Sequence, residues 1–350
     1  MTTVARLAAA LVALLCADLC HAQSSPAGAD TYPNRPVRVL LPFPPGGVVD
    51  VMGRLLAQKL SDRLGQNFYV ENHGGGGGNI GAAMVQAAPP DGYTLLITSS
   101  SFLINPGLQK VPYDPVGGFA PITIPSASPS VLVVNPADPA KTVKELIEAI
   151  KKEPGKHSYA SAGVGSTPHL QGEMFRLAFG LDMVHVPFGG GGPALQSAVA
   201  GHTPIAFAAL PPAIPLIKSG HLHALAVIGP KGVSALPGVP TMTEAGLPGQ
   251  ETETVLLVLA PAGTSKEIVN RLHRELVSII AMPDVQQKFD ALGFAPVGRR
   301  PRIPRHGSRP SSTCGRRSFA TRRSNPSTAT PDNVRRRPAR LRRHQILRLS

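Results

Sequence analysis

The sequence has few cysteines and no tryptophan, and aromatic residues make up only 5% of its 350 residues. Cys16 and Cys20 lie in an N-terminal apolar segment, and Cys314 lies in an arginine-rich C-terminal tail. The residues between these ends therefore offer no disulfide, no thiolate metal site and no thiol nucleophile. With 42% hydrophobic residues, this part of the chain must be held together by packing.

Acidic residues are scarce in the tail, and this imbalance produces the net charge of +14. Residues 298–350 contain sixteen arginines, no lysine and one acid, Asp332, so this segment carries +15 and the rest of the chain −1. A block of arginines can bind nucleic acid through its phosphates. Nucleic-acid binding would thus depend wholly on the tail, and we expect no nucleic-acid partner for the body.

The N-terminus has a short cationic start, the apolar run LAAALVALLCA and a small-x-small motif at residues 20–22. This pattern is typical of a secretory signal peptide, and the apolar run is too short to span a bilayer. We expect a periplasmic protein from which residues 1–22 are cleaved after Ala22. An uncleaved membrane anchor is the alternative.

Strand-like runs alternate with helical patterns along the body. PVRVLLPF at 36–43 is typical of a buried strand, and Val49, Met52, Leu56 and Leu60 follow it at helical spacing. Such alternation predicts an α/β fold with parallel sheets covered by helices on both faces.

Two proline-rich breaks, near residues 121–129 and 229–240, are the expected crossings between two domains. We predict one α/β domain from residues 32–125 plus 230–297, and a second from 126–229.

Four loops between predicted strands and helices are rich in glycine but contain no lysine or arginine: PFPPGGVVD, ENHGGGGGNIG, SAGVGSTPH and PFGGGGP. Ligands of α/β folds bind where strands end and helices begin. A helix N-terminus presents unpaired N–H groups and a partial positive charge, so it can hold an anion without a basic side chain. Any one loop could be only a tight turn, but together they predict a backbone-held carboxylate or phosphate.

The sequence gives no sign of a cofactor or metal. Residues 76–81 satisfy G-x-G-x-x-G, yet a polyglycine run matches this pattern by default, and residues 98–101 lack the acid expected after the next strand. There is no P-loop motif, and the eleven histidines show no metal-ligand spacing. We expect neither a dinucleotide nor a metal ion.

A secreted hydrolase is the alternative function. Ser166 and His169 lie close together in GVGSTPH and could be drawn as nucleophile and base. At a loop that enters a helix they are more simply explained as an N-cap and as ligand donors.

The chain resembles the Bug (TctC-like) receptors, on the segments YPNRPVRVLLPFPPGGVVD, PPDGYTLL, GVGSTPH, ALPGVPTMTEAGLPG and LAPAGT, in family order over residues 32–298. These receptors are the solute-binding components of tripartite tricarboxylate transporters. The resemblance implies a periplasmic-binding-protein type II fold, with a ligand cleft between two α/β domains. It also implies a small carboxylate ligand, a membrane permease as partner, a monomer and no catalysis.

The resemblance also carries ligand contacts to positions in the loops. Asp50 is expected to orient the first loop rather than to touch a carboxylate, because two anions repel. The implied contact residues are Phe43, Gly46, Gly47, Asp50, Gly77, Gly78, Asn79, Ser99, Ser100, Gly165, Ser166, Thr167, His169, Phe188 and Gly191.

The sequence departs from the family pattern at the site and at the C-terminus. Phe188 and Gly189 replace a common Tyr-Lys pair, residues 204–209 lack the usual acids, and residues 73–76 replace a common Arg-Pro-Gly-Ala. These changes favour a ligand with an aromatic or apolar part.

The tail at residues 298–350 has no apolar periodicity, although the family has a closing helix there. Read one base out of frame, codons compatible with the tail can spell a segment with helical apolar spacing. We interpret the tail as out-of-frame translation, and we expect it to be disordered and the product to be less stable than an in-frame chain.

Overall fold

The computed structural model describes residues 32–301. The predicted signal peptide and most of the arginine-rich tail lie outside the described residues. Helices and strands alternate as predicted, which confirms the α/β class. The elements are β1 (Val37–Leu41), α2 (Val48–Leu64), β2 (Phe68–Asn72), η1 (Gly76–Gly78), α3 (Asn79–Gln86), β3 (Thr94–Ser99), α4 (Ser101–Leu108), β4 (Phe119–Val134), α5 (Val143–Lys152), β5 (His157–Ser161), α6 (Thr167–Phe179), β6 (Met183–Pro187), α7 (Gly191–Val199), β7 (Ile205–Ala209), α8 (Leu210–Lys218), β8 (His223–Ile228), β9 (Glu253–Pro261), α9 (Lys266–Ile280), α10 (Pro283–Leu292) and β10 (Ala295–Arg299).

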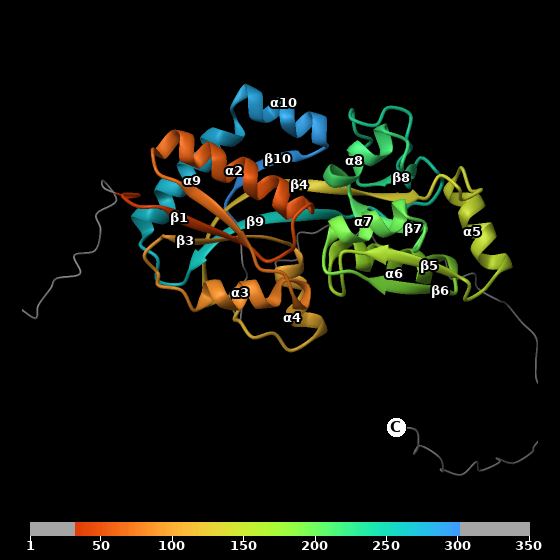
Figure 1. Cartoon of the computed structure of the whole chain (residues 1–350), viewed down its shortest axis with the longest axis horizontal. Helices are drawn as coiled ribbons and strands as arrows, with labels where there is room; N and C mark the ends of the chain where they lie inside the picture. The colour runs from red at the N-terminus through yellow and green to blue at the C-terminus, as the bar shows by residue number, and fades with distance from the viewer. Residues whose placement is uncertain (1–31, 302–350) are drawn as a thin grey trace, which may run out of the picture. The chain divides into compact units, whose positions relative to one another are not determined.

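The elements form two groups joined by long strands (Figure 1). Lobe A contains β1 to β3, α2 to α4, α9, α10 and β10, and lobe B contains α5 to α8 and β5 to β8. Strands β4 and β9 run side by side between the lobes, and the strand order is β2-β1-β3-β9-β4-β7-β5-β6, with β8 and β10 also paired to β4.

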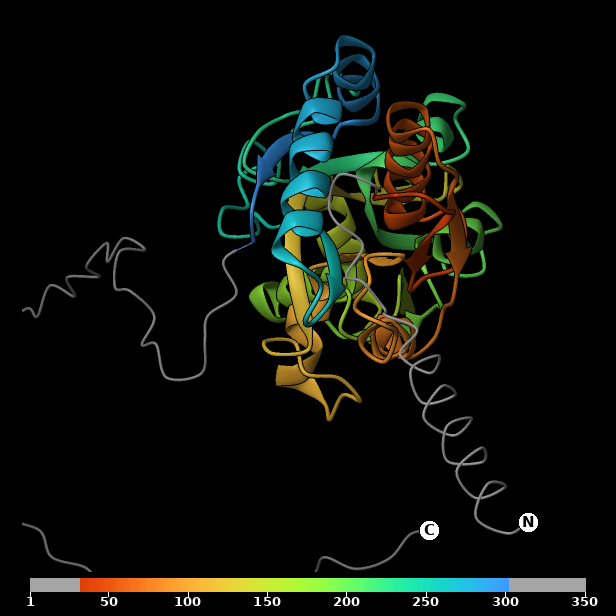
Figure 2. The ribbon, with the colours of Figure 1, turned by 90° about the vertical axis from the view of Figure 1, so that its left-hand side faces the viewer.

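Helices cover both faces of the sheet, because successive side chains of each strand point to opposite faces and both sets are apolar. In lobe A, Val39 and Leu41 pack in one cluster with α2 and α9, whereas Leu40 packs in another with α3. Figure 2 shows α9 lying along β4, which it contacts. In lobe B, Leu132 packs with α5 and α6 on one side, and Val133 packs with α7 and α8 on the other. These layers hold the loops between strands and helices in fixed positions.

The sequence analysis predicted a break at residues 121–129, but the structure has these residues within the continuous strand β4. Proline cannot donate to a strand ladder and is therefore tolerated at irregular positions. The register of β4 against β9 shifts between Pro121 and Thr123 and again before Ala127, which accommodates the prolines.

The sheet is also less parallel than predicted. Strands β4 and β9 run antiparallel to their neighbours, whereas β1 pairs in parallel with β2 and β3, and β5 with β6 and β7. Met242 and Leu247, placed with the first domain by the sequence analysis, pack into a core cluster of lobe B. Within residues 32–301 no helix is long and apolar enough to cross a membrane.

Candidate functional site

A cavity lies where the loops of the two lobes meet. The cavity has a volume of about 40 Å³. Residues of both lobes and of β9 form its wall, and none of these carries a charged side chain among the described residues. The lining residues are Phe43, Gly47, Val48, Val49, Ser99, Ala162, Ser166, Thr167, Pro168, Gly191, Ala194, Phe207, Ala208, Ala209 and Thr254.

The beginnings of four helices contribute to this wall. Gly47 is the N-cap of α2, Ser166 that of α6 and Ala209 that of α8, and Gly191 is the first residue of α7. Within residues 32–301, no side chain caps α2, α7 or α8 by a hydrogen bond. The first-turn N–H groups of α2, those of Gly191 and Gly192 in α7, that of Leu210 in α8 and the positive ends of the three helix dipoles are therefore available to a negatively charged ligand. Pro193, Pro211 and Pro212 have no N–H to donate.

Four hydroxyl groups line the cavity, and one of them is unpaired. Ser99 Oγ lies 2.7 Å from Ser101 Oγ, and Ser166 Oγ donates to the Gly163 carbonyl at 2.7 Å. Thr254 is 3% exposed, and its Oγ1 has no hydrogen-bond partner among the described residues. A buried unpaired hydroxyl is costly unless a ligand or a water satisfies it.

Sequence analysis missed Thr254 because β9 was not recognised as a strand of the crossing. The run ETETVLLVLAP contains the alternation and β-branched residues that could have predicted the strand. Thr254 pairs with Ser128 of β4, and this pairing helps to place it at the cavity.

The rest of the wall is apolar. Phe43 and Val49 contribute from lobe A, and Phe207, Ala208 and Ala209 contribute from the end of β7. Residues 204–209 were noted for their missing acids but were not predicted as contacts. A ligand in this cavity would meet methyl groups and an aromatic ring at that position.

Six of the predicted contact residues line the cavity: Phe43, Gly47, Ser99, Ser166, Thr167 and Gly191. The other predicted residues do not line it. They are Gly46, Asp50, Gly77, Gly78, Asn79, Ser100, Gly165, His169 and Phe188.

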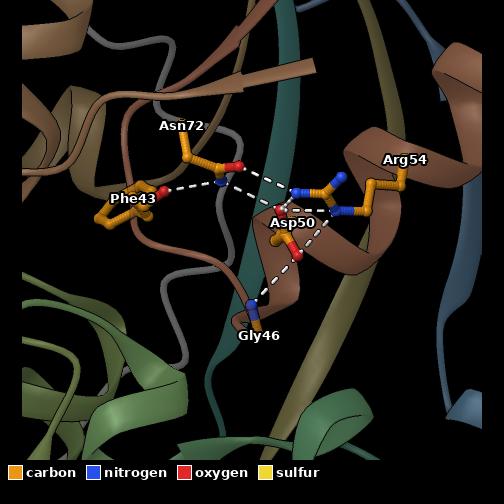
Figure 3. A network of polar contacts seen from close by, with 5 residues as sticks. All are labelled: Phe43, Gly46, Asp50, Arg54 and Asn72. Carbon is orange, nitrogen blue, oxygen red and sulfur yellow. Dashed lines mark hydrogen bonds and ion pairs between the residues drawn. The ribbon is translucent and has the colours of Figure 1, made fainter. Parts of the chain in front are cut away.

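Asp50 holds the first loop in place through hydrogen bonds and does not line the cavity (Figure 3). Its carboxylate accepts hydrogen bonds from the Gly46 N–H at 3.1 Å, from Arg54 Nε at 3.0 and 3.1 Å, and from Asn72 Nδ2 at 3.0 Å. Asn72 Nδ2 also donates to the Phe43 carbonyl at 3.0 Å. Burial alone would raise the pKa of Asp50, but the hydrogen bonds from Arg54, Gly46 and Asn72 outweigh it and lower the pKa. The carboxylate thus fixes both ends of the loop that presents Phe43.

The polyglycine run lies where the lobes approach each other. Gly75 to Gly78 all have positive φ, which other residues rarely adopt. A Cβ at Gly77 would lie 2.9 Å from the Val164 carbonyl oxygen of lobe B, and one at Gly78 would lie 3.0 Å from the Phe43 ring. Glycine is therefore needed here for backbone conformation and for close approach.

The arrangement of Ser166 and His169 does not suit a nucleophile and its base. Ser166 Oγ accepts a hydrogen bond from the backbone N–H of His169 at 3.3 Å, as an N-cap does. The ring Nδ1 of His169 instead accepts from the Gly165 N–H at 3.2 Å. The centre of the His169 ring lies 4.3 Å from that of His185, and the two rings are tilted by 34°. Nε2 of His185 lies 2.7 Å from Ser161 Oγ.

Both rings favour the neutral form. Burial lowers the pKa of His169, and Glu173 opposes this effect. Burial, assisted by the neighbouring His169, lowers the pKa of His185 to about 4. Over residues 32–301, no group of three or more His, Cys, Asp or Glu residues could hold a metal ion.

Comparisons with known proteins agree with this architecture. A UPF0065 protein from a Pseudomonas species is 38% identical over 277 residues, covering 78% of this chain and 82% of that protein. Protein BugT from Bordetella pertussis is 37% identical over the same length, covering 78% and 85%.

Solved structures are similar as well. The periplasmic binding protein BugD has a TM-score of 0.74 at 35% identity, covering 76% of this chain and 90% of that chain. An R. palustris protein with adipate has a TM-score of 0.74 at 33% identity, covering 76% and 89%. MatC from Rhodopseudomonas palustris with bound malate has a TM-score of 0.71 at 30% identity, covering 76% and 91%.

The periplasmic-binding-protein fold predicted from the sequence is thus confirmed. The hydrolase alternative is wrong, since these relatives are solute-binding receptors and not enzymes. The family model of the tripartite tricarboxylate transporter family receptor, TctC, matches residues 52–301, and the chain belongs to this family.

Proposed function

We propose that the chain binds a small carboxylate-bearing molecule in the cavity between its lobes and delivers it to a membrane permease. One observation carries the proposal: the first turns of α2, α6, α7 and α8 line a single cavity that has hydroxyls but no charged side chain. Partial positive charges of helix termini stabilise an anion there without a basic side chain in the wall. The adipate and malate in the structures of two relatives support this class of ligand.

The proposed contacts are the six predicted residues that line the cavity together with the unpaired hydroxyl of Thr254. Phe207 and the alanines beside it would contact the apolar part of the ligand. The other predicted residues, Asp50 among them, would act by holding the loops.

Loops of both lobes line the cavity, which has a volume of about 40 Å³, so entry of a dicarboxylate would require the lobes to separate. We propose that the two lobes are domains that hinge about β4 and β9. Cleavage after Ala22, a periplasmic location and action as a monomer complete the proposal.

A thermal-shift screen of mono-, di- and tricarboxylates and aromatic acids tests it. A ligand that binds only the folded state adds about 2.7 kcal/mol of stability at one hundred times its Kd, which raises the melting temperature. Each acid is paired with its uncharged amide, such as adipate with adipamide. We expect a shift with the acid only, and equal shifts with acid and amide would contradict an anion site.

A further inference from the structure

Gly165 of lobe B and Asn105 of lobe A lie so close together that there is no room for a side chain at residue 165. A Cβ at Gly165 would lie 1.9 Å from Asn105 Oδ1 and 3.1 Å from its Cγ. Gly165 lies in the loop between β5 and α6, and Asn105 lies in α4. Any side chain at residue 165 must therefore displace Asn105 or push the lobes apart.

Asn105 is held firmly on its own side of this contact. It is fully buried, and its Nδ2 donates at 3.0 Å both to the Gly77 carbonyl and to Asn79 Oδ1. Gly77 in turn lies against the Val164 carbonyl of lobe B. Asn105 thus connects the polyglycine loop and the start of α3 to the surface that meets lobe B.

A hydrogen bond joins the lobes next to this contact. Ser100 Oγ, just before α4, lies 2.9 Å from Thr167 Oγ1 at the start of α6. Thr167 lines the cavity, as do Ser99 and Ser166 beside these two residues. A change in the distance between the lobes at this point would therefore also move residues of the cavity wall.

We infer that Asn105 and Gly165 form a closure stop that sets how far the lobes close, and that the Ser100–Thr167 hydrogen bond holds them there. Asn105 is a positioning residue in this scheme and does not contact the ligand. The inference rests on the proposed function, because a set degree of closure matters only if a solute is enclosed.

The unpaired Asn105 Oδ1 makes closure of the lobes less favourable. Within residues 32–301 it has no hydrogen-bond partner, although it is buried. Separation of the lobes would let water donate to it, so closure carries a desolvation cost. This cost makes closure less favourable than it would be with a paired oxygen, and solute binding would offset it.

The variant Gly165→Ala tests the closure stop against a matched control in the full chain. Gly180 also has positive φ, +60° against +78° at Gly165, but a Cβ there would meet nothing within 4 Å. Gly180→Ala therefore reproduces the backbone strain without the contact between lobes. Titration calorimetry with adipate and with malate measures binding, and thermal melts measure stability.

We expect Gly165→Ala to bind whichever acid the wild type binds at least about tenfold more weakly, which corresponds to about 1.4 kcal/mol. Gly180→Ala should stay within about twofold of wild type, while both variants lose similar stability because of φ strain. A structural role alone would lower both melting temperatures without separating the two affinities. Equal affinities of the two variants would overturn the inference.

Removal of the opposing side chain should rescue binding. The double variant Gly165→Ala with Asn105→Ala should bind more tightly than Gly165→Ala alone, because the clash is gone. No gain over the single variant would exclude Asn105 as the stop.

A disulfide cross-link tests the same contact without a ligand and without changing Asn105. Ser100→Cys and Thr167→Cys are introduced after Cys16, Cys20 and Cys314 are replaced by serine. Mild oxidation should cross-link this pair, and should do so equally with Gly180→Ala but much less with Gly165→Ala.

Failure to cross-link in every background, or equal yields in all, would refute the stop. If no acid binds the wild type, the proposed function fails, and the cross-link yields still decide the inference.

Discussion

The Asp50 network gives the sharpest stability prediction. Asp50→Asn keeps the shape of the side chain but turns one acceptor oxygen into a donor, which then faces the N–H groups of Gly46 and Arg54. Hydrogen bonds to a charged group contribute about 1.5–3 kcal/mol each. Arg54 is 54% exposed, so its ion pair adds little, about 0–1 kcal/mol. We expect a loss of about 2 kcal/mol at neutral pH, or about 4–8 °C in melting temperature.

The loss should depend on pH in a defined direction. The folded-state pKa of Asp50 is lowered, so its contribution is fully present above the unfolded-state pKa of about 4 and disappears as the pH falls through the folded-state value. Urea unfolding at pH 7 and at acidic pH therefore should show a gap between variant and wild type that narrows with acid.

The control is Glu153→Gln, which removes the exposed pair with Lys156 and should leave the urea midpoint unchanged. The reasoning is refuted if Asp50→Asn unfolds at the wild-type urea concentration at pH 7, or if the gap is independent of pH.

Two further predictions concern the cavity and the histidines. Thr254→Val replaces an unpaired buried hydroxyl by a methyl group, so the ligand-free protein should be as stable as wild type or more so. Its affinity for the bound acid should fall by about 2- to 10-fold. Thermal melts measure the stability and calorimetry the affinity, and an unchanged affinity would remove Thr254 from the site. The lowered pKa of His185 means that the unfolded state binds a proton between about pH 6.5 and 4 that the folded state does not, so stability should fall as the pH is lowered through that window. His185→Asn should flatten this slope, and an unchanged slope would assign it to other groups.

The parts of the fold that depend on local pattern could be predicted from the sequence. Helix α2 begins at Val48 and buries Val49, Met52, Leu56 and Leu60 at the spacing seen in the sequence. Strand β1 follows in the same way from its apolar run. In both cases neighbouring residues carry enough signal to fix the element.

The pairing of the crossing strands could not be predicted, because it depends on partners that are distant in the sequence. Prolines in β4 mimic a break, and only pairing with β7, β8, β9 and β10 keeps the chain extended through residues 119–134. The same long-range pairing carries Thr254 to the cavity. Local propensity contains no information about either contact.

The sequence predicted which loops form the candidate site, but not which of their residues line the cavity. Sequence placed Gly47, Ser99, Ser166 and Gly191 at strand–helix junctions, and these junctions do surround one cavity. It could not separate residues that line the cavity from residues that support it, such as Asp50. That distinction depends on which way each loop turns.

Among residues 32–301 no lysine or arginine lines the cavity, and this has a consequence for selectivity. A basic side chain attracts any anion over a long range, whereas helix termini act only within about one turn and in fixed directions. The proposed anion site would therefore recognise a carboxylate but do little to distinguish one acid from another. Discrimination is left to the remaining wall, where Phe207, Ala208 and Phe43 favour apolar groups and the hydroxyl of Thr254 is the unpaired polar group. We therefore expect substitutions at the end of β7 to change which acid is bound while the glycine loops stay the same.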